Sequence, residues 1–102
     1  MSRPRLEETF SRSVSMVGRR IGDRYVLVPL AGRGADLDSV LALDRVAAFV
    51  WERLDGPRSG ASIVDAIVEQ FAVERPRAEG DLVDLLEALV AASAVVADPE
   101  RR

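Results

Sequence analysis

Residues 41–56, LALDRVAAFVWERLDG, constrain the fold of this 102-residue chain more than any other stretch. They begin as a short apolar strand, and Asp44 then stands where a carboxylate can accept hydrogen bonds from the free N–H groups of a helix start. Over residues 45–55, apolar side chains recur at three- and four-residue spacing, which predicts a helix with one broad buried face. We expect Trp51 in the core, because a large aromatic side chain commonly fills the centre of a small helical core.

Upstream of this stretch, the pattern predicts a β-hairpin followed by a third strand. Residues 14–21 alternate loosely, Gly22 and Asp23 form a tight-turn dipeptide, and residues 24–30 (RYVLVPL) are rich in β-branched and aromatic side chains. A glycine-containing loop over residues 31–36 then leads to a strand over residues 37–43.

Downstream, two more helices are predicted. The first covers residues 63–71 with Ser62 as its cap, and the second runs from Pro76, or from Asp81 if Gly80 delays its start, to about residue 92. The last helix carries Leu82, Val83, Leu85, Leu86, Leu89 and Val90. Its apolar residues cover nearly half the circumference, which is wider than the stripe that core packing needs.

The chain is expected to form one domain over residues 13–98, between a flexible tail at residues 1–12 and a short tail at residues 99–102. No apolar run suits a signal peptide or a membrane span, so a cytoplasmic protein without a membrane partner is expected.

Catalytic and metal sites have few candidate residues. The sequence contains no cysteine and no histidine, which removes thiolate nucleophiles, imidazole bases and the usual transition-metal ligands. The carboxylate pairs Asp36/Asp38 and Asp81/Asp84 suit solvated positions or helix ends. We therefore expect no enzyme activity, no catalytic or metal-binding residue and no cofactor.

Nucleic-acid binding is disfavoured by charge. The net charge is −3 and the isoelectric point is about 4.9. Arg19, Arg20 and Arg24 surround the hairpin turn, where they could touch phosphates or simply be solvated. The second and third predicted helices carry carboxylates and no interior arginine, so neither suits the major groove.

The third strand is the remaining candidate site. If it lies at the edge of a three-stranded sheet, its free N–H and C=O groups can pair with an added peptide strand. A chain tail covering this edge is the alternative, and the residues alone do not choose between the two.

The order of these pieces resembles the PqqD-like family, the RiPP recognition elements. The resemblance covers the hairpin VGRRIGDRYVLVPL, the strand and helix LALDRVAAFVWERLDG, the helix SIVDAIVEQF and the segment GDLVDLLEALV. It implies an α+β, winged helix-turn-helix-like fold, with a three-stranded antiparallel sheet followed by three helices.

The resemblance also implies noncatalytic binding of the leader peptide of a ribosomally synthesised precursor, by antiparallel addition to the third strand. The partner would be a modifying enzyme, either a radical-SAM protein or a leader peptidase, and a homodimer is possible through the same edge. A winged-helix transcriptional regulator and an adaptor that binds no leader peptide are the alternatives. The implied peptide-binding residues are Ser39, Val40, Leu41, Ala42 and Leu43 on the strand, and Val83, Leu86, Glu87 and Val90 on the third helix. These helix residues form the shoulder beside Leu82, Leu85 and Leu89, which are expected to face the core.

Overall fold

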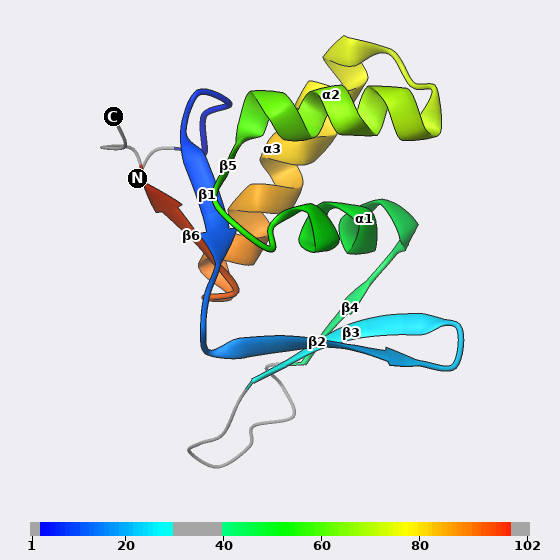
Figure 1. Cartoon of the computed structure of the whole chain (residues 1–102), viewed down its shortest axis with the longest axis vertical. Coiled ribbons are helices and arrows are strands. Elements are labelled where there is room, and N and C mark those ends of the chain that lie inside the picture. Colours follow the sequence, from blue (N-terminus) through cyan, green and yellow to red (C-terminus); the bar gives the residue numbers. More distant parts are fainter. Residues whose placement is uncertain (1–2, 30–39, 99–102) are drawn as a thin grey trace.

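The computed structural model describes residues 3–29 and 40–98, which form two small antiparallel sheets and three helices (Figure 1). None of the helices in these residues is long and apolar enough to cross a membrane. The elements, in chain order, are β1 (Thr9–Arg12), β2 (Met16–Ile21), β3 (Arg24–Pro29), β4 (Leu41–Leu43), α1 (Arg45–Arg53), β5 (Arg58–Ser59), α2 (Gly60–Phe71), α3 (Arg75–Ala91) and β6 (Val95–Asp98).

The sheet β2-β3-β4 confirms the predicted hairpin and third strand. β2 and β3 pair antiparallel from Met16↔Pro29 to Ile21↔Arg24. Gly22 has φ of +64°, a value that the two-residue turn requires and that glycine adopts without strain. β4 pairs antiparallel with β3 over its three residues. The predicted loop at residues 31–36 and the first part of the predicted strand lie outside the described residues.

Local signals also set the helix starts, with two differences. Asp44 caps α1 as predicted, because its Oδ1 accepts a hydrogen bond from the N–H of Ala47 at 2.8 Å. α2 begins earlier than predicted, since the cap is Ser59 and not Ser62. α3 begins at Arg75, so Gly80 does not delay its start.

The sheet β5-β1-β6 was not predicted, and it corrects the domain boundary at residue 13. β1 pairs with β6 from Thr9↔Asp98 to Arg12↔Val95, and with β5 on its other side. Phe10 in β1 is 0% exposed. Residues 9–12 are therefore part of the fold and not a flexible tail. The polar composition of this segment hid the strand, whose partner β6 lies at the opposite end of the chain.

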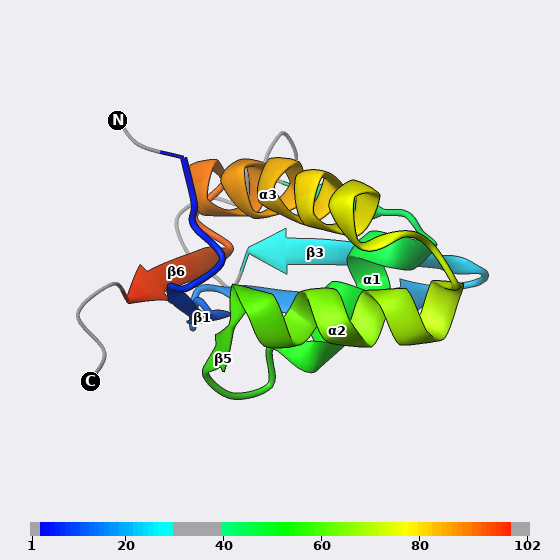
Figure 2. The same cartoon turned by 90° about the horizontal axis from the view of Figure 1, so that it is seen from above.

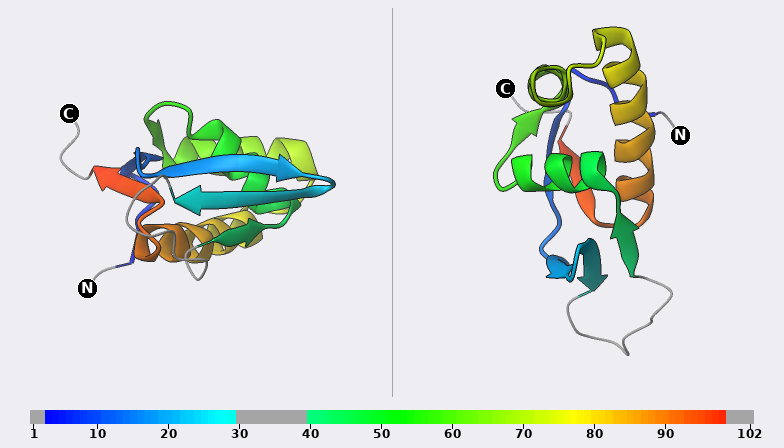
Figure 3. Two further views of the ribbon diagram at one scale, coloured as in Figure 1. Left: turned by 90° about the horizontal axis from the view of Figure 1, so that it is seen from below. Right: turned by 90° about the vertical axis from the view of Figure 1, so that its right-hand side faces the viewer.

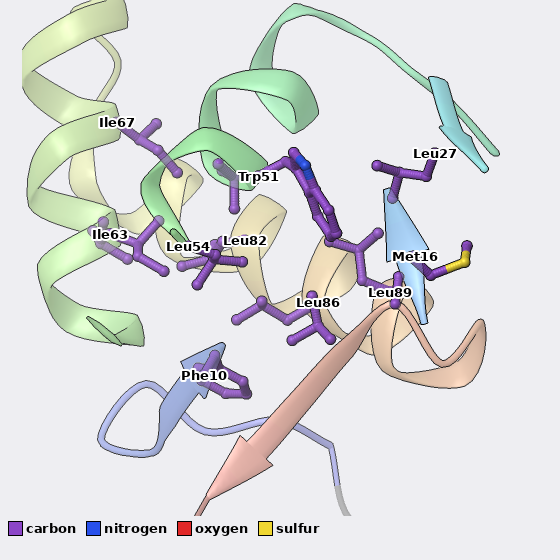
Figure 4. Packing of buried hydrophobic residues seen from close by; sticks show 14 of the residues in the cluster. Phe10, Met16, Leu27, Trp51, Leu54, Ile63, Ile67, Leu82, Leu86 and Leu89 are labelled. Carbon is purple, nitrogen blue, oxygen red and sulfur yellow. The ribbon is translucent and has the colours of Figure 1, made fainter. Parts of the chain in front are cut away.

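The core lies between the helices and the two sheets (Figures 2 and 4). Trp51 is 1% exposed, as predicted, and Phe10, Leu54, Leu82 and Leu86 point into the same cluster. Arg12 ties β1 to α1, because its guanidinium donates to the carbonyl oxygen of Trp51 at 2.8 and 3.0 Å. The core thus joins both sheets to the helices and holds β4 beside α3.

Candidate functional site

β4 is an edge strand of its sheet. The strand order is β2-β3-β4, and among the described residues β4 pairs with no strand other than β3. Its second edge can therefore pair with an added strand, which the N–H and C=O groups of a sheet edge readily accept.

The side chains of β4 alternate about this edge. Leu41 and Leu43 are half-buried and pack against the core, whereas Ala42 between them is exposed. Val40, just before the strand, is half-buried as well. Ser39 lies outside the described residues. The packing of Leu41 and Leu43 thus holds the strand against the core, and the backbone N–H and C=O groups of its outer edge are held in position for pairing.

α3 lies beside β4 and runs in the opposite direction (Figure 3). Where β4 ends, a hollow of about 430 Å³ opens between the start of α1 and the N-terminal half of α3. We call this hollow the groove. Its lining residues are Asp44, Val46, Ala47, Ile67, Arg77, Asp81, Leu82, Asp84 and Leu85.

The helical phase of α3 differs by one residue from the prediction. Leu86, predicted to face a peptide, is 0% exposed and packs in the core with Leu82 and Leu89 (Figure 4). Leu85, predicted to face the core, is half-buried and lines the groove. Placing Leu86 at the binding face was therefore wrong, because the wide apolar stripe of this helix allowed either phase.

The other predicted residues of α3 lie on its opposite shoulder. Val83 lines a separate hollow with Leu6, and Val90 follows it two helical turns later on the same side. Glu87 is paired with Arg3 of the N-terminal segment at 3.5 Å. None of Val83, Glu87 and Val90 is among the described residues that line the groove.

The N-terminal segment covers the part of this opposite shoulder around Val83 and Glu87, whereas Val90, further along the helix, is 38% exposed. The carbonyl oxygen of Leu6 accepts a hydrogen bond from the N–H of Ala61 at 2.9 Å, which fixes the segment against the start of α2. A Cβ atom on Gly60 would lie 2.9 Å from the Cα of Leu6, so the close approach requires a glycine there. Only the shoulder that carries Asp81 and Leu85 faces the groove.

The groove is apolar at its floor and mainly acidic at its rim. Asp44, Asp81 and Asp84 line it together with one arginine, Arg77. Arg77 lies 3.5 Å from Asp81, and Arg3 forms an ion pair with Asp84 from the other side of the helix.

The chemistry available here is that of binding. The strand edge supplies main-chain donors and acceptors, the floor supplies apolar surface and the rim supplies carboxylates. Within residues 3–29 and 40–98, no group of three potential ligands among His, Cys, Asp and Glu is placed to hold a metal ion. This combination suits an extended peptide that pairs with the strand and inserts side chains beside it.

Comparison with known proteins decides the family. The profile of coenzyme PQQ synthesis protein D (PqqD) matches residues 24–95, which is most of the chain. The chain belongs to the PqqD family. No curated protein sequence matches it.

Two solved structures share the PqqD fold of this chain. TbiB1, in complex with the TbiA(beta) leader peptide, is 32% identical with a TM-score of 0.69, and the alignment covers 83% of this chain and 93% of TbiB1. A lasso peptide synthetase B1, complexed with the leader peptide, is 23% identical with a TM-score of 0.70, over 85% of this chain and 96% of that one. The family assignment and the winged-helix-like PqqD fold predicted from sequence are thus confirmed.

Sequence reasoning thus found one side of the candidate site and missed the other. Its choice of the third strand agrees with the position of β4 at the sheet edge. It missed Leu85 as a lining residue and gave Asp81 and Asp84 only a solvated role. Which shoulder of α3 is open to a peptide depends on the N-terminal segment, which contacts the other shoulder. That contact joins distant parts of the chain and has no local signal in the sequence.

Proposed function

We propose that this protein binds the leader peptide of a ribosomally synthesised precursor by β-strand addition to β4 and delivers it to a modifying enzyme. The observation that carries the proposal is the edge of β4, which no other described strand covers and which leads into the groove, in a protein 32% identical to one solved with a leader peptide. PqqD-family members are leader-peptide-binding partners of modifying enzymes, which agrees with a noncatalytic role.

The peptide-binding residues that we propose are those of the strand and of one shoulder of α3. On the strand they are Val40, Leu41, Ala42 and Leu43, and Ser39 before them stays a prediction. On α3, Leu85 replaces Leu86, and the N-terminal half of the helix forms the wall of the groove.

Main-chain hydrogen bonds to β4 supply part of the affinity, at about 0.5–1.5 kcal/mol net for each bond. Because β4 has only three residues, these bonds alone give weak binding, and apolar contacts in the groove must supply the rest. Selectivity then comes from side chains that fit the groove.

The proposed role of the complex is to raise the local concentration of the precursor at an enzyme. Once the leader is held, the remaining part of the precursor meets the bound enzyme by an intramolecular encounter. We propose a radical-SAM protein or a leader peptidase as that enzyme, acting in the cytoplasm. Homodimer formation through the β4 edge stays a prediction, and it would compete with peptide binding.

An amide NMR titration tests the proposal. The probes are the synthetic TbiA(beta) leader peptide and leader peptides from small open reading frames beside the gene of this protein. We expect saturable shifts at residues 40–43 and in the N-terminal half of α3 with at least one of these peptides.

A DNA duplex serves as the control for the winged-helix alternative. Salt-sensitive shifts with DNA around Arg19, Arg20 and Arg24, together with no shift for any peptide, would contradict leader binding and favour a regulator. Peptide shifts that spare β4 would contradict strand addition.

A further inference from the structure

The rim of the groove carries more negative than positive charge. Among the described residues, three carboxylates, Asp44, Asp81 and Asp84, line it with one arginine, Arg77. Asp44 is engaged as the cap of α1 through the N–H of Ala47. Asp81 and Asp84, three residues apart on one side of α3, are therefore the charges that a ligand would meet.

Both carboxylates already hold a guanidinium in the free protein. Arg3 reaches Asp84 from the N-terminal segment, and Arg77 lies 3.5 Å from Asp81. The side chains of Arg3 and Arg77 are 56% and 77% exposed, so solvent screens these pairs and little free energy opposes their exchange. The two arginines show that the rim accepts cationic side chains at these positions.

The direction of β4 places the groove relative to the peptide. Asp44 directly follows Leu43, so β4 runs toward the groove. Figure 3 shows the direction of β4, and a strand added antiparallel to it would run away from the groove. The N-terminal part of the bound peptide therefore lies at the groove, and its C-terminal part leaves past Val40.

We propose that the leader peptide carries a Lys or Arg side chain that pairs with Asp81 and Asp84, next to an apolar side chain that fills the groove. Both side chains belong to the part of the peptide that lies N-terminal to the stretch paired with β4. This inference rests on the proposed function and names the class of peptide that the site selects. The apolar side chain of the peptide packs on the groove floor, which is formed by Val46, Ile67 and Leu85. The Lys or Arg side chain of the peptide pairs with the carboxylates of the rim.

A charge scan of the peptide tests this inference. In the leader peptide that binds most tightly, each position is replaced in turn by Lys and by Glu, and dissociation constants are measured by fluorescence anisotropy at low and high salt. We expect one or two adjacent positions, N-terminal to the strand-pairing stretch, where Lys binds roughly threefold to tenfold more tightly than Glu. High salt should reduce this preference.

Two protein variants form a matched pair for the scan. Asp84 and Glu87 are both partners of Arg3. Asp84 lines the groove and also the hollow beside Leu6 and Val83, whereas Glu87 lines neither. Asp84→Asn should reduce the preference for Lys, and Glu87→Gln should leave it unchanged.

Each outcome separates this inference from the proposed function. Peptide binding with no positional preference for Lys would overturn the inference and leave leader binding intact. A preference on the C-terminal side, or one that Asp84→Asn does not reduce, would also overturn it. Failure of every peptide to bind would contradict the proposed function and this inference together.

Discussion

Leu85 and Val83 provide the sharpest test of where a peptide binds. Both are half-buried apolar residues of α3, and they lie on opposite shoulders of the helix. Leu85 lines the groove beside β4, whereas Val83 lies near Leu6 of the N-terminal segment. Leu85→Ala should weaken peptide binding, and Val83→Ala should not.

The expected loss follows from the apolar surface that the change removes. Leu→Ala deletes three carbon atoms, which at about 0.8 kcal/mol for each buried carbon is about 2.4 kcal/mol for a side chain that moves from full exposure to full burial. Because Leu85 is already half-buried in the free protein, the peptide can cover only about half of this surface. The loss of binding free energy is then about 1.2 kcal/mol, or about a sevenfold higher dissociation constant.

Fluorescence anisotropy with a labelled leader peptide measures this difference. Circular dichroism and thermal unfolding of each variant check that the fold is retained, since both changes also remove packing contacts. An equal or larger loss with Val83→Ala would show that the peptide lies on the opposite shoulder. Unchanged affinity in a folded Leu85→Ala protein would refute a role of the groove.

Three further predictions concern the fold that holds the site. Phe10→Ala should lower the free energy of unfolding by about 3–5 kcal/mol in urea denaturation, because the residue is fully buried; a change below about 1 kcal/mol would mean that β1 is not part of the cooperative core. Asp44→Ala should cost about 1 kcal/mol in the same assay through loss of the bond to the N–H of Ala47, while Asp44→Asn should restore most of it. Arg12→Ala should cost about 1–3 kcal/mol, since it removes two charge-assisted hydrogen bonds to the carbonyl oxygen of Trp51, which keeps only the bond from the N–H of Leu54; the near-ultraviolet signal of Trp51 should shift in the folded variant, and an unchanged signal would speak against this contact.

Apolar periodicity in the sequence predicts that α3 is a helix, but it does not fix which of its residues face the core. In α3, apolar residues at 82, 83, 85, 86, 89 and 90 cover so much of the circumference that two helical phases bury similar surface. Only packing distinguishes them: Leu86 meets Phe10 and the rest of the core, and Leu85 is left at the groove. No local sequence signal distinguishes Leu85 from Leu86 as the residue that faces the core.

The elements whose cause is local could be predicted from the amino-acid sequence. The Gly22–Asp23 turn sets the hairpin, Asp44 caps α1 through a neighbour three residues away, and the apolar spacing around Trp51 selects the buried face of α1. These features depend on backbone geometry and hydrogen bonds within a few residues.

The features that join distant parts of the chain arise from tertiary packing and could not be predicted in this way. β1 becomes a strand because β6, at the other end of the sequence, pairs with it, and Arg3 and Leu6 cover one shoulder of α3. The free shoulder, with Leu85 and Asp81, then faces the groove at the end of β4. Such contacts depend on which surfaces remain to be buried after the local elements have formed. Those surfaces are known only once the whole chain is packed.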